Sequence, residues 1–115
     1  MKGFKFSSVA GALEEARAVL GGRDARMIGY NTLLLREGEH CVVRLYNTNI
    51  MRITKDTISL RAGGHMTRLT KERLNEYLPT GFSIQVKKKE WFLWDHKART
   101  EPFFDGILIT DNGIQ

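Results

Sequence analysis

The side chains best suited to chemistry surround two adjacent glycines in the middle of the chain, where cations and hydroxyls are concentrated. Two glycines permit positive φ angles and a close approach of the backbone to a ligand. A helix that begins just after them would add unpaired N–H groups and the positive end of its dipole. We therefore expect an anion-binding corner for a phosphate or a carboxylate, with ordinary turn and cap chemistry as the alternative. The residues of this corner are Gly63, Gly64, Thr67, Arg68, Thr70, Lys71 and Arg73.

Positive charge is unevenly distributed along the chain. The net charge is +5, and the segment from Arg44 to Lys89 contains ten Lys or Arg but only three Asp or Glu, an excess of seven. Such asymmetry favours an acidic partner, with nucleic acid as the first candidate, while a solvated face kept for solubility is the alternative. We expect Arg44, Arg52 and Arg61 to project from alternating strands and to share one basic face with the corner.

A second basic group precedes a cluster of aromatic residues. Lys87, Lys88 and Lys89 occupy a predicted hairpin tip. Lysines beside aromatic rings favour single-stranded nucleic acid, because bases stack on rings, whereas a charged tip also protects a sheet edge from aggregation. We expect Trp91 in the core and leave Trp94 open. As exposed aromatics dominate protein contacts, Tyr46 and Trp94 are also candidate anchors for a protein partner.

No complete catalytic set is visible. The three histidines do not lie at metal-ligand spacing from one another or from the single cysteine, and zinc-protease, CxxC, nucleophile-elbow and P-loop patterns are missing. Asp95, Glu101 and Asp105 could hold a divalent metal as the carboxylates of a nuclease do, but turn and surface roles explain them better. We expect no catalytic residues, no metal and no cofactor.

The first half of the chain predicts a helix followed by an antiparallel meander. A helical apolar period over residues 9–20 is capped by Ser7 and Ser8 and ends at Gly21 and Gly22. Short connections then separate apolar or alternating segments, which is typical of antiparallel strands. These predicted strands cover residues 27–36, 40–46, 50–54 and 57–61.

The second half predicts one short helix and further strands. Thr70 is the expected N-cap of a helix over residues 71–78, with Leu74, Tyr77 and Leu78 buried and Pro79 as its stop. A hairpin and a last strand complete the domain. The predicted strands cover residues 82–87, 90–95 and 105–110.

These elements define an α+β domain that spans residues 1–115, with an N-terminal helix, an antiparallel β-meander, one short helix, a C-terminal hairpin and a last strand. No apolar run approaches the roughly 20 residues of a membrane span, and no secretory signal is visible. The lone Cys41 lies in a strand-like run and is expected in the core. We therefore expect a cytoplasmic protein without a membrane partner, and exposed sheet edges leave homo-oligomers open.

Several ordered blocks carry a resemblance to a known family. They are Arg44–Ile50 (RLYNTNI), Gly63-Gly64, Thr70–Asn75 (TKERLN), Leu78-Pro79, Gly81-Phe82, Trp91 and Phe104–Gly106 (FDG). With them the chain resembles a family of small uncharacterised bacteriophage and prophage proteins. The likeness covers roughly residues 28–109 and leaves the N-terminal helix outside. Family members often carry an aromatic residue where this chain has His65, which speaks against an essential acid-base role there. The resemblance implies a viral accessory protein that acts in the host cytoplasm.

Three functions follow from these observations. The leading hypothesis is a non-enzymatic phage accessory protein whose basic face binds an acidic target, either nucleic acid or a host nucleoprotein complex. The alternative is an inhibitor or adaptor that acts on a host defence or regulatory protein by protein contact. The third is a metal-dependent nuclease that uses Asp105.

Overall fold

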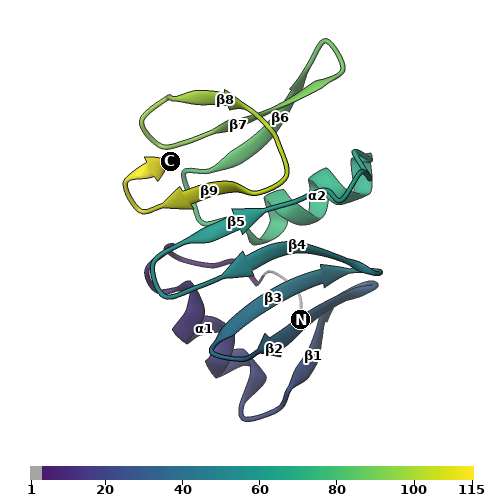
Figure 1. Ribbon diagram of the computed structural model, residues 1–115, viewed down its shortest axis with the longest axis vertical. Helices are drawn as coiled ribbons and strands as arrows, with labels where there is room; N and C mark the ends of the chain where they lie inside the picture. Colours follow the sequence, from purple (N-terminus) through teal and green to yellow (C-terminus); the bar gives the residue numbers. More distant parts are fainter. Residues whose placement is uncertain (1–3) are drawn as a thin grey trace.

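The structure, a computed structural model, describes residues 4–115, and over these residues the chain forms two helices and ten strands (Figure 1). In chain order they are α1 (Ala12–Leu20), β1 (Ala25–Gly29), β2 (Thr32–Glu37), β3 (His40–Leu45), β4 (Thr48–Ile53), β5 (Ile58–Leu60), α2 (Arg68–Tyr77), β6 (Ser83–Lys87), β7 (Glu90–Trp94), β8 (Thr100–Pro102), β9 (Ile107–Thr110) and β10 (Gly113–Ile114). None of the described helices has the length and apolar character needed to cross a membrane.

The strands form two antiparallel sheets. The larger has the order β1-β2-β3-β4-β5-β9-β10, and the smaller has the order β6-β7-β8. Strands β1 to β5 are a meander, as predicted, and α2 together with the small sheet is inserted between β5 and its neighbour β9. The α+β class and the element types of the prediction are confirmed.

One face of the large sheet carries the core. Leu34, Val43, Met51 and Leu60 are cross-strand neighbours and are fully buried. Helix α1 packs beside β1, β2 and β3. From α2, the Tyr77 hydroxyl donates to the carbonyl oxygen of β1 residue 28 at 3.4 Å, so α2 reaches the same region of the molecule. Each Å² of apolar surface buried contributes about 25 cal/mol to stability. This buried face is therefore the main source of the stability of the domain.

Polar contacts fix the start of α1. One comes from a residue just before the helix, and two come from the β9–β10 turn, which is distant in sequence. The N-cap of α1 is Gly11, so the prediction that Ser7 and Ser8 cap this helix is wrong. Ser8 Oγ instead accepts from Gly11 N at 2.9 Å in the turn just before the helix. The Asp111 carboxylate accepts from Val9 N at 2.7 Å and from Ala10 N at 2.9 Å. The β9–β10 turn therefore holds the start of α1 in place.

The prediction of one strand over residues 27–36 is wrong, because β1 and β2 form a hairpin there. Tyr30 and Asn31 make the turn, and Asn31 has the positive φ of 52° that asparagine tolerates better than most residues. Apolar residues occupy both strands, so the sequence reads as one continuous run. The short strands β8 and β10 were also not predicted.

The small sheet has a buried face and an outer face. Ile84, Trp91 and Leu93 lie on the buried face, and Trp91 is in the core as predicted. Phe92 and Trp94 alternate with them and lie on the outer face, where both are partly exposed. Cys41, in the large sheet, is fully buried, as expected.

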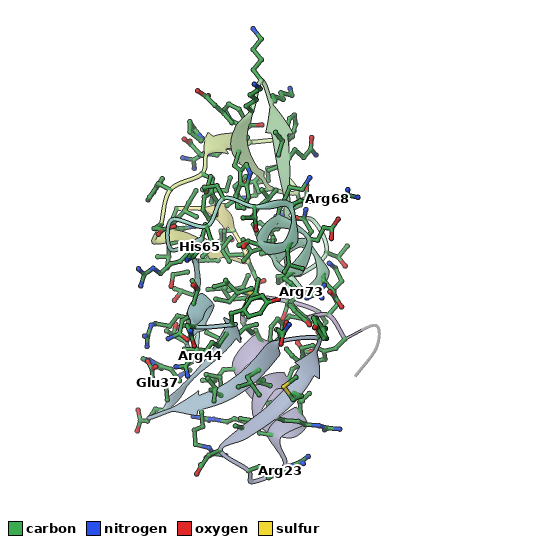
Figure 2. The ribbon with its side chains drawn as sticks, turned by 90° about the vertical axis from the view of Figure 1, so that its right-hand side faces the viewer. Arg23, Glu37, Arg44, His65, Arg68 and Arg73 are labelled. Carbon is green, nitrogen blue, oxygen red and sulfur yellow. The ribbon has the colours of Figure 1, made fainter. Side chains whose placement is uncertain are left out.

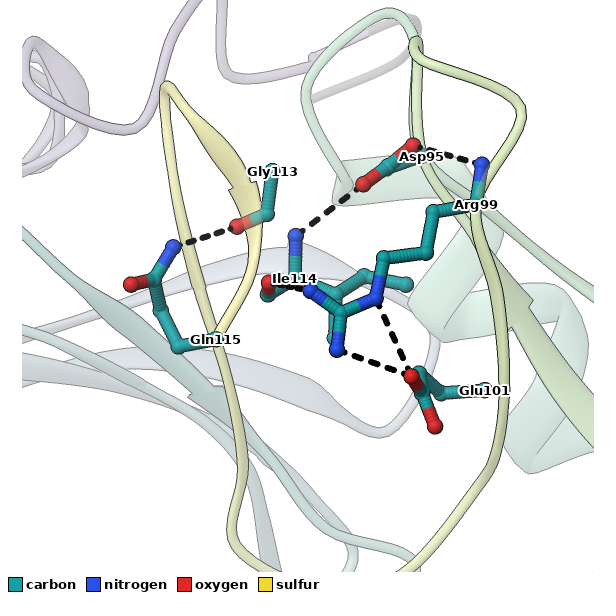
Figure 3. A network of polar contacts seen from close by, with 6 residues as sticks. All are labelled: Asp95, Arg99, Glu101, Gly113, Ile114 and Gln115. Atoms are coloured by element: carbon teal, nitrogen blue, oxygen red, sulfur yellow. Dashed lines mark hydrogen bonds and ion pairs between the residues drawn. The ribbon is translucent and has the colours of Figure 1, made fainter.

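A polar junction around Asp95 connects the two sheets (Figure 3). Asp95 Oδ1 accepts from the backbone N–H groups of Lys97 and Arg99 at 2.8 and 3.0 Å, and Oδ2 accepts from Ile114 N at 3.2 Å. Burial alone would raise the pKa of Asp95, but these three N–H groups and the nearby His96 outweigh it and hold that pKa below its ordinary value.

Two further residues complete this junction. Arg99 Nη1 donates to the Ile114 carbonyl at 2.8 Å, while its Nη2 and Nε donate to Glu101 Oε1 at 2.8 and 3.0 Å. Gly113 has a φ of +114°, and a Cβ atom there would lie 2.5 Å from Asp95 Oδ2. Only glycine therefore allows the β7 end and β10 to approach this closely.

Candidate nucleic-acid interface

The outer face of the small sheet combines aromatic rings with positive charge. By strand alternation and register, Phe92 and Trp94 of β7 lie on the same face as Gln85 and Lys87 of β6. Lys87 Nζ lies 5.3 Å from the centroid of the Trp94 ring, a cation–π contact. This face therefore offers flat rings and a cation side by side.

The hairpin tip next to this face carries the other two lysines. Lys88 and Lys89 have φ angles of 50° and 66°, which fits the tight two-residue turn predicted here. Both side chains are exposed, and within residues 4–115 none of the three lysines takes part in an ion pair. The tip forms one end of the molecule (Figure 1). Its charges are thus available to a polyanion.

The arginines of the meander and of α2 are mostly paired with carboxylates of the same chain. Arg68 Nε lies 2.9 Å from Glu72 Oε1, and Arg73 Nη1 lies 3.2 Å from Glu76 Oε2. Arg52 pairs with Glu37 across the sheet. Each of these ion pairs neutralises an arginine that was expected to contact the acidic target.

These arginines also point in different directions. Arg44 and Arg52 share one face of the large sheet, and Arg44 Nε donates to Asn49 Oδ1 at 2.7 Å. Figure 2 shows Arg44 along one side of the molecule and Arg68 on the opposite side. Arg61 is exposed just after β5. The cations of residues 44–73 therefore do not assemble into the single basic face that was expected, and the lysine hairpin lies apart from them.

The glycine corner is shaped by the needs of the turn. Asp105 accepts from Ala62 N at 2.7 Å and from Gly63 N at 3.0 Å, so its carboxylate fixes the loop. Gly63 and Gly64 have φ angles of 62° and 83°, and a Cβ atom on Gly63 would lie 2.7 Å from Thr48 Cγ2. The two glycines therefore serve the backbone path between β5 and α2.

The hydroxyls of this corner are bonded to each other and to the helix start. Thr67 is the N-cap of α2 and accepts from Thr70 N at 3.2 Å, so the prediction of Thr70 as the cap is wrong. Thr70 is only 4% exposed, and its hydroxyl lies 3.1 Å from that of Thr67. Lys71 is half-buried. The structure thus brings Thr67 and Thr70 together at the start of α2, where they cap the helix.

A groove adjoins this corner that the sequence did not predict. It lies between the β3–β4 turn and the start of α2 and has a volume of about 390 Å³. Its lining joins Tyr46, expected as a protein contact, to residues expected in the anion corner. The lining residues are Leu45, Tyr46, Asn47, Thr48, Ile50, His65, Thr67, Leu69 and Thr70. Segments about 20 residues apart meet here, so no local motif marked the groove.

The molecule is a small α+β protein with an inserted sheet that carries aromatic and basic residues. Comparison with known protein families shows which family it belongs to. Residues 14–110 match the family described as Kyanoviridae Gp96 protein, and the chain belongs to this family of phage proteins. The match includes most of α1, so the expectation that the N-terminal helix lies outside the family likeness is wrong. No curated protein and no solved structure is significantly similar to the chain.

Proposed function

We propose that this phage-encoded accessory protein binds single-stranded nucleic acid in the host cytoplasm through the outer face of β6–β8. One observation carries the proposal: Lys87 lies over Trp94 on a face that also presents Phe92. Bases stack on exposed rings regardless of sequence, and lysines neutralise the phosphates between them. Lys88 and Lys89, which form no ion pair within residues 4–115, extend the positive charge beyond the rings.

In this mode of binding, rings and lysines contribute differently. Each stacked base contributes about 1–3 kcal/mol, as judged by alanine substitution. Each phosphate contact adds about −0.7 to the slope of log K against log salt for a single strand. Loss of Trp94 should therefore weaken binding at every salt concentration, whereas loss of the lysines should mainly reduce the salt dependence.

The direct test measures the anisotropy of a fluorescein-labelled oligothymidylate with Trp94→Ala and Trp94→Phe. We expect at least about tenfold weaker binding for Trp94→Ala and near-complete retention for Trp94→Phe, which keeps a stacking ring. The indole Nε1 has no hydrogen-bond partner among residues 4–115, so the phenylalanine variant breaks no described hydrogen bond. Tyr30→Ala, which removes an exposed ring from another part of the molecule, is the matched control. Equal affinity of Trp94→Ala and the control would refute the proposal.

A second candidate function, contact with a host protein as an inhibitor or adaptor, is favoured by two exposed tyrosines. Tyr30 and Tyr46 are 74% and 57% exposed. They project from neighbouring hairpin turns, which are joined by a bond from Tyr46 N to the Asn31 carbonyl at 2.9 Å. Aromatic rings held on rigid turns are typical anchors of protein interfaces. A partner retained from nuclease-treated host lysate by the wild type and lost with Tyr46→Gly would support this function, and retention by the variant would refute it.

A further inference from the structure

The side chains on the outer face of the small sheet form rows that run across its strands. The strand register places Trp94 between Ser83 of β6 and Thr100 of β8, and in the next row it places Phe92 beside Gln85. All five side chains are at least partly exposed. Hydroxyl and amide groups beside a ring can bond the edge of a base that stacks on that ring. Each ring therefore has neighbours suited to a base.

This face holds two rings and ends on both sides of them. Toward the hairpin tip, the next row pairs Lys87 with Glu90. In the other direction β7 ends at Trp94, and the following residue, Asp95, is only 7% exposed. Among the described strands of this sheet, β6 and β8 add no ring to the face. The face therefore offers stacking surfaces for two bases.

The spacing of the two rings does not match that of stacked bases. Phe92 and Trp94 are two residues apart on one strand. Because an antiparallel strand advances about 3.4 Å per residue, their α-carbons should be about 7 Å apart. Successive bases of a stacked strand are only about 3.4 Å apart. Two neighbouring bases can therefore occupy both rings only after they have separated from each other.

A lysine lies where the link between two separated bases would run. Lys87 belongs to the row at the tip, yet its ammonium lies 5.3 Å from the centroid of the Trp94 ring. The contact therefore crosses the intervening row, which contains Phe92. The hairpin has three lysines against the single acid Glu90, so an excess of positive charge remains to neutralise a phosphate on this path.

We infer that the outer face of β6–β8 binds two consecutive bases that are unstacked from each other, one on Phe92 and one on Trp94, and therefore prefers pyrimidine strands. Every base has a face that can stack on a ring, so the rings themselves do not create this preference. It comes from the energy needed to separate neighbouring bases, which is larger for adenines than for thymines. The inference rests on the proposed function and adds the number of bases and the preferred class of strand.

The first test counts bases on the wild-type protein. The probes are fluorescein-labelled decamers of abasic nucleotides that carry no thymine or one, two or three adjacent thymines, so the number of phosphates is constant. We expect the first and second thymines each to tighten binding at least about fivefold. The third should add no more than about twofold, because it only offers a second way to place two bases. No gain from the second thymine, or an equal gain from the third, would overturn the inference.

The second test measures the cost of separating the bases. Unlabelled deca-thymidylate and deca-adenylate compete with the labelled probe for the wild-type protein. We expect the thymidylate to bind at least about fivefold tighter, with the same slope of log K against log salt, because both strands present the same phosphates. Equal or tighter binding of the adenylate, or a difference that resides in the salt slope, would overturn the inference.

A matched pair of variants assigns the preference to the two rings. Phe92→Leu leaves one ring, which can stack on the end of a run of bases without separating any of them. The gain from the second thymine should then disappear, and the thymidylate preference should fall below about twofold. Phe92→Tyr keeps a ring and should keep both effects. Phe92 is only partly buried and leucine is apolar, so the variant should remain folded. An undiminished preference in Phe92→Leu would contradict the inference.

The outcomes separate this inference from the function on which it rests. If the wild type binds oligothymidylate and Trp94→Ala weakens that binding, while the second thymine adds nothing, the inference fails alone and the proposed function stands. If Trp94→Ala binds oligothymidylate like the wild type, both fail.

Discussion

The two sheets present their cations in opposite ways. On the large sheet and α2, Arg52, Arg68 and Arg73 each pair with a glutamate of the same chain. On the small sheet, the described lysines form no ion pair, and Lys87 lies against an aromatic ring. The arginine region was the more prominent in the sequence, yet the lysine hairpin is better arranged to bind a polyanion. The difference is one of pairing: the arginines are engaged by carboxylates of the same chain, and the described lysines are not.

Polar contacts attach the small sheet to the large sheet and to α2. The small sheet is inserted between β5 and β9 and is held by two polar junctions in addition to apolar packing. At one junction Asp95 accepts from Ile114 of β10, and at the other the side-chain amide of Asn75 bonds to both backbone groups of Ile84 in β6.

The largest effect should come from Asp95→Ala, which removes the acceptor of three backbone N–H groups. Unsatisfied buried donors cost about 1–3 kcal/mol each, and because water will reach some of them we expect a total loss of about 2–4 kcal/mol in the free energy of unfolding. Urea denaturation measures this loss. Glu101→Ala, which removes only the exposed partner of Arg99, is the control and should cost less than about 1 kcal/mol. Equal losses for both variants would show that Asp95 does not hold the sheets together.

The same junction should make stability depend on acid pH. Because the folded-state pKa of Asp95 is lowered, its contribution is complete above the unfolded pKa of about 3.9 and is lost as the pH falls through the folded value. Wild-type stability should therefore drop below about pH 4, and Asp95→Asn should show a shallower drop in that window. Thermal unfolding across this range tests the sign, and identical pH profiles would contradict it.

A smaller effect is expected at the other junction. Asn75 Oδ1 accepts from Ile84 N at 2.7 Å, and its Nδ2 donates to the Ile84 carbonyl at 3.0 Å, so this side chain acts as a partner strand at the edge of β6. Asn75→Ala should lower the free energy of unfolding by about 1–2 kcal/mol, and faster hydrogen exchange at the Ile84 amide would localise the change. Unchanged protection of this amide would refute the role.

The smallest effect should follow from breaking an arginine pair. Glu72→Gln releases Arg68, and because the pair is exposed the free energy of unfolding should change by less than about 0.5 kcal/mol. Electrostatic attraction to the oligonucleotide should rise slightly, since one negative charge is removed. A large gain in affinity would show that pairing had masked a real site on α2.

Alternation and turn residues predicted much of this fold. The faces of β7, the burial of Trp91 and the lysine turn followed from a period of two between clear breaks. The β1–β2 hairpin was missed because both of its strands are apolar and its turn contains Tyr30. Thr67 and Thr70 lie three residues apart and both suit a cap, so sequence alone did not choose between them.

The candidate sites were less predictable because they depend on distant contacts. The pair Arg68–Glu72 has helical spacing and was open to prediction. Arg52 meets Glu37 only through the register of three strands, and the Tyr46 groove needs the β3–β4 turn to meet α2. No sequence pattern gives these distances.

The most direct test of the central claim is the salt dependence of oligothymidylate affinity in a variant of the lysine turn. Lys88→Asn with Lys89→Gly removes two charges and installs residues that favour the positive φ angles already present, so the hairpin should be preserved. The control is Arg68→Ala with Lys71→Ala on α2. We predict that the negative slope of log K against log salt becomes shallower by about 1.4 in the turn variant and stays unchanged in the control. An unchanged slope in the turn variant, with a reduced slope in the control, would contradict the account and move the site to α2.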